Sequence, residues 1–204
     1  MMRKTFLLLA GLFSLLSPAW GQKNEFAISA GAMFTSGTEL ACNNPCIQLP
    51  RVQVNTPPTA AFQGAFARHI EDVRGSSLYL ELPLLGIAGR EASTPTGFPV
   101  NYSSIFVPPS LKIKFRPGQA ISPFFSAGAG VAYLNGNNNG RNFTGSGQFG
   151  AGADFKTRIP FLAIRGEVRD FFSGRSAAEE RVEGPVSDSR QHNIFTGVGA
   201  VLRF

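Results

Sequence analysis

Residues that bind metals or act as nucleophiles are scarce in this chain of 204 residues. It has two cysteines, Cys42 and Cys46, and two histidines, His69 and His192. A structural zinc site needs about four Cys or His ligands, and neither histidine is near the cysteines in sequence. The composition therefore predicts no metal site and no cofactor. In an oxidising compartment, two cysteines this close together instead predict a disulfide that closes a small loop tip.

Clustered charge of one sign is also missing. Charged residues make up 16% of the chain, and 19 Lys and Arg against 13 Asp and Glu give a net charge of +6. The basic residues are scattered, whereas a surface that follows a nucleic-acid backbone needs them gathered in a patch or stripe. We therefore predict no nucleic-acid partner.

Long hydrophobic runs are absent except at the N-terminus. Arg3 and Lys4 precede an apolar run, Phe6–Leu16, and the small residues Ala19 and Gly21 follow it. This order predicts a secretory signal peptide over residues 1–21, with cleavage after Gly21. An uncleaved anchor is the alternative, but the run falls short of the ~20 apolar residues that a spanning helix needs. The remainder, residues 22–204, is predicted to form one domain.

Glycine and phenylalanine are abundant instead, with 23 and 19 residues, and apolar residues alternate with small or polar ones. Alternation of this kind predicts β-strands, because successive side chains of a strand point to opposite faces. Eight segments carry the pattern: Phe26–Thr35, Thr59–Ile70, Ser77–Ile87, Ser104–Arg116, Ile121–Leu134, Phe143–Lys156, Pro160–Phe172 and Gln191–Phe204. The predicted fold class is all-β, an eight-stranded antiparallel up-and-down barrel.

The two faces of these segments differ in chemistry. In the last segment Ile194, Val198 and Leu202 share one face, and Arg203 lies on the other. The charged residues on the second face form the predicted inward set: Glu81, Lys112, Lys114, Asp154, Lys156, Arg165, Glu167, Arg169 and Arg203. A water-soluble barrel with the opposite arrangement is the alternative. Segment lengths near the ~9–11 residues of a tilted membrane strand, and aromatic residues at segment ends, favour the transmembrane arrangement.

The connections alternate in length, which indicates how such a barrel lies in a membrane. Long or polar stretches follow the first, third, fifth and seventh segments: residues 36–58, 88–103, 135–142 and 173–190. The other three connections are short: residues 71–76, 117–120 and 157–159. Bacterial outer-membrane barrels have short periplasmic turns and longer extracellular loops. We therefore expect both termini in the periplasm and the long connections outside the cell.

Three stretches resemble the outer-membrane protein A-like barrel superfamily. They are the ending Val201-Leu202-Arg203-Phe204, the turn Arg116-Pro117-Gly118 that leads into residues 121–133, and Arg165–Phe171. The resemblance implies an eight-stranded transmembrane barrel that meets the barrel-assembly machinery through a terminal aromatic signal, here Phe204. Outer-membrane protein A continues into a peptidoglycan-binding domain, whereas this sequence ends at the barrel. Peptidoglycan tethering is therefore not implied.

For the function, we expect a structural or surface-interaction role. Envelope integrity and binding of an extracellular ligand through residues 36–58 and 173–190 are both open, since long loops on a rigid scaffold often bind partners. We expect a monomer in contact with outer-membrane lipid and lipopolysaccharide. The inward charges are expected to form a salt-bridge network that plugs the lumen.

Two alternatives remain. A switch among Glu81, Lys112, Arg165 and Glu167 would make the protein a small gated channel. A lipid A-modifying enzyme would need a histidine near the outer leaflet, and His192 is the only suitably placed one. The residues after it are Asn193 and Ile194, so the His-x-Ser pattern of lipid A deacylase barrels is absent. We therefore predict no catalytic residues.

Overall fold

The computed structural model describes residues 24–35, 38–40, 52–54, 57–93, 99–136, 141–173 and 191–204. The predicted signal peptide, residues 1–21, lies outside these ranges, and so do Cys42 and Cys46. Leader cleavage and the disulfide therefore stay predictions.

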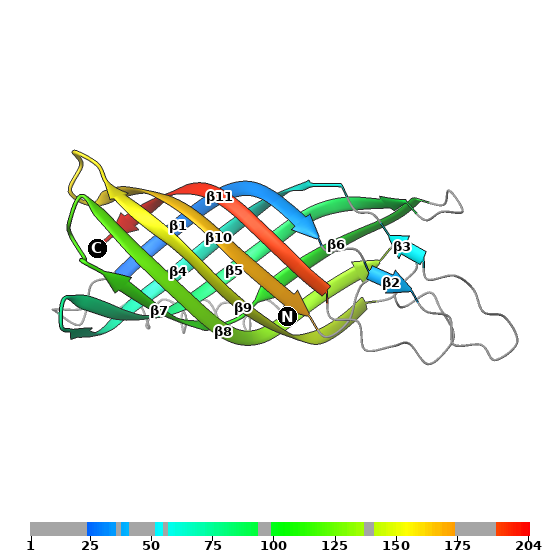
Figure 1. Cartoon of the computed structure of the whole chain (residues 1–204), viewed down its shortest axis with the longest axis horizontal. Coiled ribbons are helices and arrows are strands. Elements are labelled where there is room, and N and C mark those ends of the chain that lie inside the picture. The colour runs from blue at the N-terminus through cyan, green and yellow to red at the C-terminus, as the bar shows by residue number, and fades with distance from the viewer. Residues whose placement is uncertain are drawn as a thin grey trace, which may run out of the picture.

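The described residues form a closed antiparallel barrel (Figure 1). Nine strands run round it: β1 (Asn24–Thr35), β4 (Thr59–Val73), β5 (Ser76–Ser93), β6 (Pro99–Val107), β7 (Ser110–Phe115), β8 (Ile121–Gly136), β9 (Arg141–Lys156), β10 (Leu162–Ser173) and β11 (Gln191–Arg203). Both β6 and β7 pair with β5 on one side and β8 on the other, so together they fill one position. The barrel closes where β4 pairs with both β1 and β5, which gives the eight strands that the alternation predicted.

One predicted strand is broken. The segment Ser104–Arg116 was expected to be continuous, but β6 ends at Val107 and β7 begins at Ser110. Pro108 and Pro109 lie between them, and proline has no N–H to give to a neighbouring strand. The carbonyl oxygen of Pro109 still accepts a hydrogen bond of 3.2 Å from the N–H of Ala129, which keeps the break against β8.

The strands also run further toward the long connections than the sequence predicts. Residues 88–103 were expected to be a loop, but β5 continues to Ser93 and β6 begins at Pro99. The two strands pair from Arg90 with Tyr102 to Ser93 with Pro99. Residues 36–58 likewise contain a short hairpin of β2 (Thr38–Leu40) and β3 (Val52–Val54). Outside the apolar band, strands pair through the backbone without alternating apolar side chains. A prediction from hydropathy therefore places the strand ends too early.

Three short turns lie at the other end of the barrel. Arg74 and Gly75, with φ of 42° and 83°, join β4 to β5. Positive φ at two adjacent residues is the geometry of a tight hairpin that matches the twist of its strands. The start of β1 and the end of β11 meet at this end, where Asn24 and Phe204 exchange two backbone hydrogen bonds of 2.6 and 3.0 Å.

The outer wall is apolar. Along β5, Leu80, Leu82 and Leu84 are about half exposed, whereas Glu81 and Leu85 between and beyond them are buried. Isolated apolar side chains on a protein surface are normal, but an apolar band that runs round every strand is not. Aromatic side chains near strand ends point outward as well: Phe34, Phe115, Phe143, Phe155 and Phe204. This is the surface of a transmembrane barrel, and it excludes the soluble arrangement.

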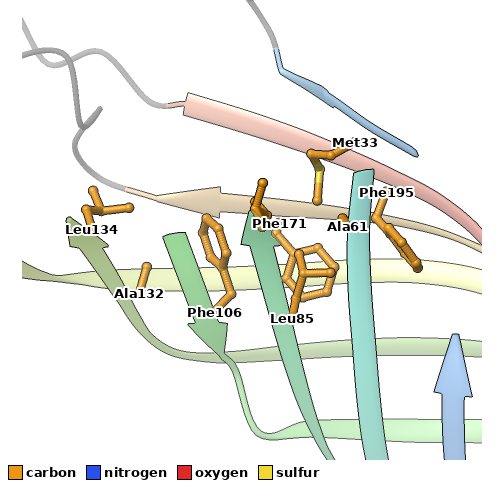
Figure 2. Close-up of a cluster of buried hydrophobic side chains, with 9 residues drawn as sticks. Met33, Ala61, Leu85, Phe106, Ala132, Leu134, Phe171 and Phe195 are labelled. Atoms are coloured by element: carbon orange, nitrogen blue, oxygen red, sulfur yellow. The ribbon is translucent and has the colours of Figure 1, made fainter. Parts of the chain in front are cut away.

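The interior toward the long connections is apolar too. Figure 2 shows a cluster of buried hydrophobic side chains in this part of the barrel. Its members come from seven of the strands. Phe106 of β6 and Phe171 of β10 meet with ring centroids 5.7 Å apart, although β8 and β9 lie between their strands in the sheet. Their contact therefore crosses the interior. We call this set the apolar layer: Met33, Ala61, Leu85, Ile87, Phe106, Ala132, Leu134, Phe171 and Phe195.

No helix in the described ranges is long and apolar enough to cross a membrane.

Candidate functional site: a charged layer inside the barrel

Below the apolar layer, toward the short turns, the interior is filled by charged side chains. On β10 the alternate residues Arg165, Glu167 and Arg169 are buried, and on β7 the same holds for Lys112 and Lys114. Alternation along each strand turns these residues inward, because their neighbours carry the apolar outer band. Small or short inward side chains leave room for the long charged ones: Ala27, Ala65, Ala163 and Val201.

Glu25, at the start of β1, binds both lysines of β7. Lys112 Nζ lies 3.0 Å from Glu25 Oε2, and Lys114 Nζ contacts Glu25 Oε1. Each lysine also has a second carboxylate partner. Lys112 Nζ is 3.2 Å from Glu81 Oε1, and Lys114 Nζ is 2.6 Å from Asp154 Oδ2.

Arg165 lies at the centre of the charged layer. Its Nε and Nη2 donate to the two oxygens of Asp154 at 2.8 and 3.2 Å, a bidentate pairing that fixes the guanidinium plane. The same guanidinium lies 3.6 Å from Glu25 and 3.7 Å from Glu81. The Phe124 ring supports it from one side, with the ring centroid 4.6 Å from Cζ.

Arg169 closes the layer on the side of the apolar cluster. Its Nη1 and Nη2 donate to Glu81 at 2.8 and 3.2 Å, and its Nε donates to Glu167 at 2.7 Å. The other oxygen of Glu167 accepts hydrogen bonds from Ser29 Oγ at 2.6 Å and from Gln63 Nε2 at 3.3 Å. Besides Arg169 on the same strand, side chains from two other strands, β1 and β4, therefore hold Glu167.

The end of the layer near the short turns meets solvent. Arg203 is 22% exposed there, and its Nη2 lies 3.2 Å from Asp154 Oδ2. A pocket of about 320 Å³ opens at this mouth and is lined by Glu25, Tyr79, Lys114, Pro117, Gly118, Arg203 and Phe204. The pocket therefore brings solvent close to Glu25, whereas the residues deeper in the layer, such as Glu81 and Arg169, are fully buried.

The charges of the layer nearly balance. Its members are four carboxylates (Glu25, Glu81, Asp154 and Glu167) and five cations (Lys112, Lys114, Arg165, Arg169 and Arg203). Charges in a low-dielectric interior are tolerated only when they are paired and hydrogen-bonded. The mutual pairing explains how so many ionised groups fit inside an eight-stranded barrel, whose interior has room only for side chains.

The structure brings together eight of the nine residues expected on the inward face. The exception is Lys156, the last residue of β9, whose side chain is exposed. The expectation for Lys156 was therefore wrong. Glu25 was missed because the first strand was predicted to begin at Phe26. Extending the alternation of Ala27 and Ser29 back by two residues would have found it.

The two histidines lie at opposite ends of the barrel, each beside a carboxylate. His192 Nδ1 is 2.7 Å from Asp170 Oδ2 on the outer wall of β10 and β11, near the long connections. His69 Nε2 is 2.9 Å from Asp72 Oδ1, and its ring packs edge-on against Tyr79. Asp188 and Ser189 lie outside the described residues. Within the described ranges, no three His, Cys, Asp or Glu residues gather in a way that would hold a metal ion.

A closed barrel of eight antiparallel strands, apolar outside and charged within, has the fold of the small outer-membrane β-barrels, as the sequence resemblance predicted. The structure is similar to Neisserial surface protein A (NspA), with a TM-score of 0.51 and 11% identity over 91% of this chain and 100% of that one. It is also similar to the outer membrane protein OprG from Pseudomonas aeruginosa, with a TM-score of 0.50 and 10% identity over 89% and 96% of the two chains. At these identities the likeness defines the fold alone. No family model and no curated protein sequence matches the chain.

Proposed function

We propose that the protein is an integral outer-membrane barrel with a structural or surface-interaction role, and that its filled interior makes it a rigid scaffold. The main support is that two layers of side chains, one above the other along the barrel axis, fill the lumen. The charged layer is paired across the interior, for example between Arg169 and Glu81, and the apolar layer is joined across it by Phe106 and Phe171. A lumen filled in this way supports a wall that holds loops in place.

The orientation proposed for the barrel follows from its two ends. Tight turns and the paired ends of β1 and β11 lie at one end, and we assign that end to the periplasm. The connections that begin after Thr35 and after Ser173 leave the opposite end. They are the longest in the chain, and residues 174–190 carry both acidic and basic residues. Residues 36–58 and 174–190 are therefore the proposed contact regions for an extracellular partner.

The orientation is tested by inserting an epitope tag at two positions, after Gly184 in the last long connection and after Gly118 in a short turn. Antibody added to intact cells should label the Gly184 insertion and leave the Gly118 insertion unlabelled. Both should be labelled after the outer membrane is permeabilised. Labelling of Gly118 in intact cells would reverse the orientation, and with it the proposed surface role of the long connections.

The role itself is tested in a strain that lacks the protein. The wild-type chain is compared with a variant in which residues 41–51 and 176–188 are each replaced by a short Gly-Ser linker. If the long connections carry the function, the variant should assemble in the membrane but fail to restore surface binding. If the variant restores the barrier function of the outer membrane as well as the wild type does, the barrel itself supports envelope integrity without the long connections. If neither protein changes the envelope or the surface, the proposal is wrong.

A small gated channel is the second candidate, and the pocket of about 320 Å³ at the short-turn mouth favours it. Glu25 and Lys114 line this pocket, so the charged layer has open space beside it at this mouth. Planar-bilayer recordings of the refolded protein beside a Glu167→Gln variant separate the candidates. Reproducible openings that change with the substitution would support a channel. Silence from protein that is folded and inserted would support the scaffold.

A further inference from the structure

The outer wall of the barrel has a groove that the scaffold role does not use. It has a volume of about 700 Å³ and crosses β5, β7, β8, β9, β10 and β11. That volume lies within the range of about 300–1,000 Å³ typical of small-ligand sites. The lining residues are Leu78, Leu111, Ile113, Phe125, Ser126, Ala127, Phe149, Gly150, Ala151, Val168, Asp170 and Ile194.

The sheet register arranges the large lining residues of the groove in two adjacent rows. Ile113 pairs with Phe125 and Phe125 pairs with Ala151, which makes one row of outward side chains. The next row toward the long connections runs from Ala127 through Phe149. Large side chains in each row form the walls, while small ones and the backbone at Gly150 form the floor. The groove therefore runs obliquely round the barrel, across the strands.

The groove has one carboxylate in its lining, Asp170. Asp170 extends the second row, since it pairs with Phe149 on one side and Ile194 on the other. Its side chain is 13% exposed, and Oδ2 lies 2.7 Å from His192 Nδ1. The other oxygen, Oδ1, is buried and has no hydrogen-bond partner among the described residues. An ionisable side chain on the lipid face of a barrel strand is unfavourable unless something polar meets it.

We propose that this groove binds one acyl chain of a membrane lipid, and that Asp170 and His192 hydrogen-bond an amide N–H or hydroxyl at the head of that chain. The proposal rests on the membrane insertion proposed above. The apolar floor and walls suit a hydrocarbon chain. The Asp170–His192 pair lies at the end of the groove nearest the long connections, where a lipid of the adjoining leaflet has its polar linkage. A donor that reaches the exposed part of Asp170 would give this carboxylate a second hydrogen bond beside the one to His192.

The shape of the groove favours a lipid over a second copy of the protein. A neighbouring barrel presents a convex wall, which would touch the rims at Phe125 and Phe149 and leave the floor empty. A single chain can lie along the floor from Ala127 to Ala151. Flexible acyl chains also reach a groove on the lipid face directly from the bilayer. A dimer across this face is therefore the competing outcome that the experiment has to separate.

The sequence allows a fluorescence test, because Trp20 in the predicted leader is its only tryptophan. Two reporter proteins carry Trp20→Phe together with either Phe149→Trp in the groove or Ile28→Trp on the exposed outer face of β1. Each is refolded into phosphatidylcholine vesicles that contain a brominated lipid, whose bromine atoms quench nearby tryptophan. One brominated lipid is a ceramide, which has amide and hydroxyl donors, and the other is a phosphatidylcholine, which has only ester linkages.

At Phe149→Trp we expect at least a threefold preference for the brominated ceramide over the phosphatidylcholine, and at Ile28→Trp no preference. Asp170→Leu should abolish the preference, and Ala151→Phe, which fills the groove, should reduce quenching at Phe149→Trp by both lipids. The matched control is Ala200→Phe on the outer face of β11, outside the groove, which should leave quenching of the Phe149→Trp reporter by either lipid unchanged.

Equal preference at the two reporters, or a preference that survives Asp170→Leu, would overturn the lipid site. Quenching at Phe149→Trp that falls as the protein-to-lipid ratio rises would overturn it in favour of a second copy. Failure of membrane insertion gives a different result, since neither reporter would then be quenched by either lipid. The lipid site and the membrane role are therefore tested separately.

Discussion

Arg169 and Glu81 meet across the interior of the barrel through two hydrogen bonds of 2.8 and 3.2 Å. They are 88 residues apart in sequence, on β10 and β5, and both side chains are fully buried. The pair therefore joins opposite walls and forms only when the barrel has closed. Glu81 also binds Lys112 at 3.2 Å, so one carboxylate balances cations from two strands.

Glu81→Gln is expected to lower the free energy of unfolding by about 3–5 kcal/mol, because it leaves buried cations without their partner. Urea titration of the refolded protein in micelles, followed by strand circular dichroism, measures the loss. Glu71→Gln is the matched control, since Glu71 is exposed on β4, and it should change stability by less than about 0.5 kcal/mol. A loss of similar size in both variants would mean that the Glu81 pairing contributes little.

Gly152→Ala is expected to destabilise the barrel, whereas Gly166→Ala on the adjacent strand is not. A Cβ at Gly152 would lie 2.5 Å from the Gly166 carbonyl oxygen and 2.5 Å from the Phe124 ring, which supports Arg165. Overpacking of this kind costs about 1–3 kcal/mol. A Cβ at Gly166 would meet nothing within 4 Å. The two urea midpoints test this, and equal midpoints would show that the interior absorbs the methyl group without strain.

Alternation made the charged layer predictable, because a charged residue between two apolar ones has an unambiguous face. Lys112 between Leu111 and Ile113 is such a case, and the structure turns it inward. The apolar layer had no such signal. Phe106 lies inside the barrel between two outward apolar residues, Ile105 and Val107, so hydropathy shows no contrast along that stretch. Because the interior is charged in one half and apolar in the other, polarity alone does not tell which side chains point inward.

The strand ends show a second limit of the sequence. Residues 90–93 pair with residues 99–102 through the backbone, where no apolar face has to be matched. The break at Pro108 and Pro109, in contrast, was visible in the sequence as two adjacent prolines. The strong alternation on both sides of them led to the prediction of one continuous strand. The Asp170–His192 pair was hidden because it joins two strands that only the fold brings together.

Arg74→Asn is expected to stabilise the barrel by roughly 0.5 kcal/mol. Arg74 has a φ of 42°, a left-handed conformation that costs most L-residues ~1–2 kcal/mol and that asparagine adopts more readily. Arg158→Asn in the turn between β9 and β10 is the control, because Arg158 does not have a positive φ. Thermal unfolding in micelles should show a higher midpoint for Arg74→Asn only. A lower midpoint would mean that the Arg74 side chain makes a contribution that outweighs its backbone conformation.

Two filled layers in series predict how conductance depends on substitution. Removing the cross-lumen pair with Glu81→Ala and Arg169→Ala should leave the refolded barrel closed to ions, because the apolar layer still fills the interior toward the long connections. Phe106→Ala with Phe171→Ala should also leave it closed, because the charged layer is intact. All four substitutions together should produce steady openings in planar bilayers. Circular dichroism before each recording separates a closed barrel from an unfolded one. Conductance after removal of the charged pair alone would show that the apolar layer does not close the lumen, and it would favour a channel whose gate is the charged layer.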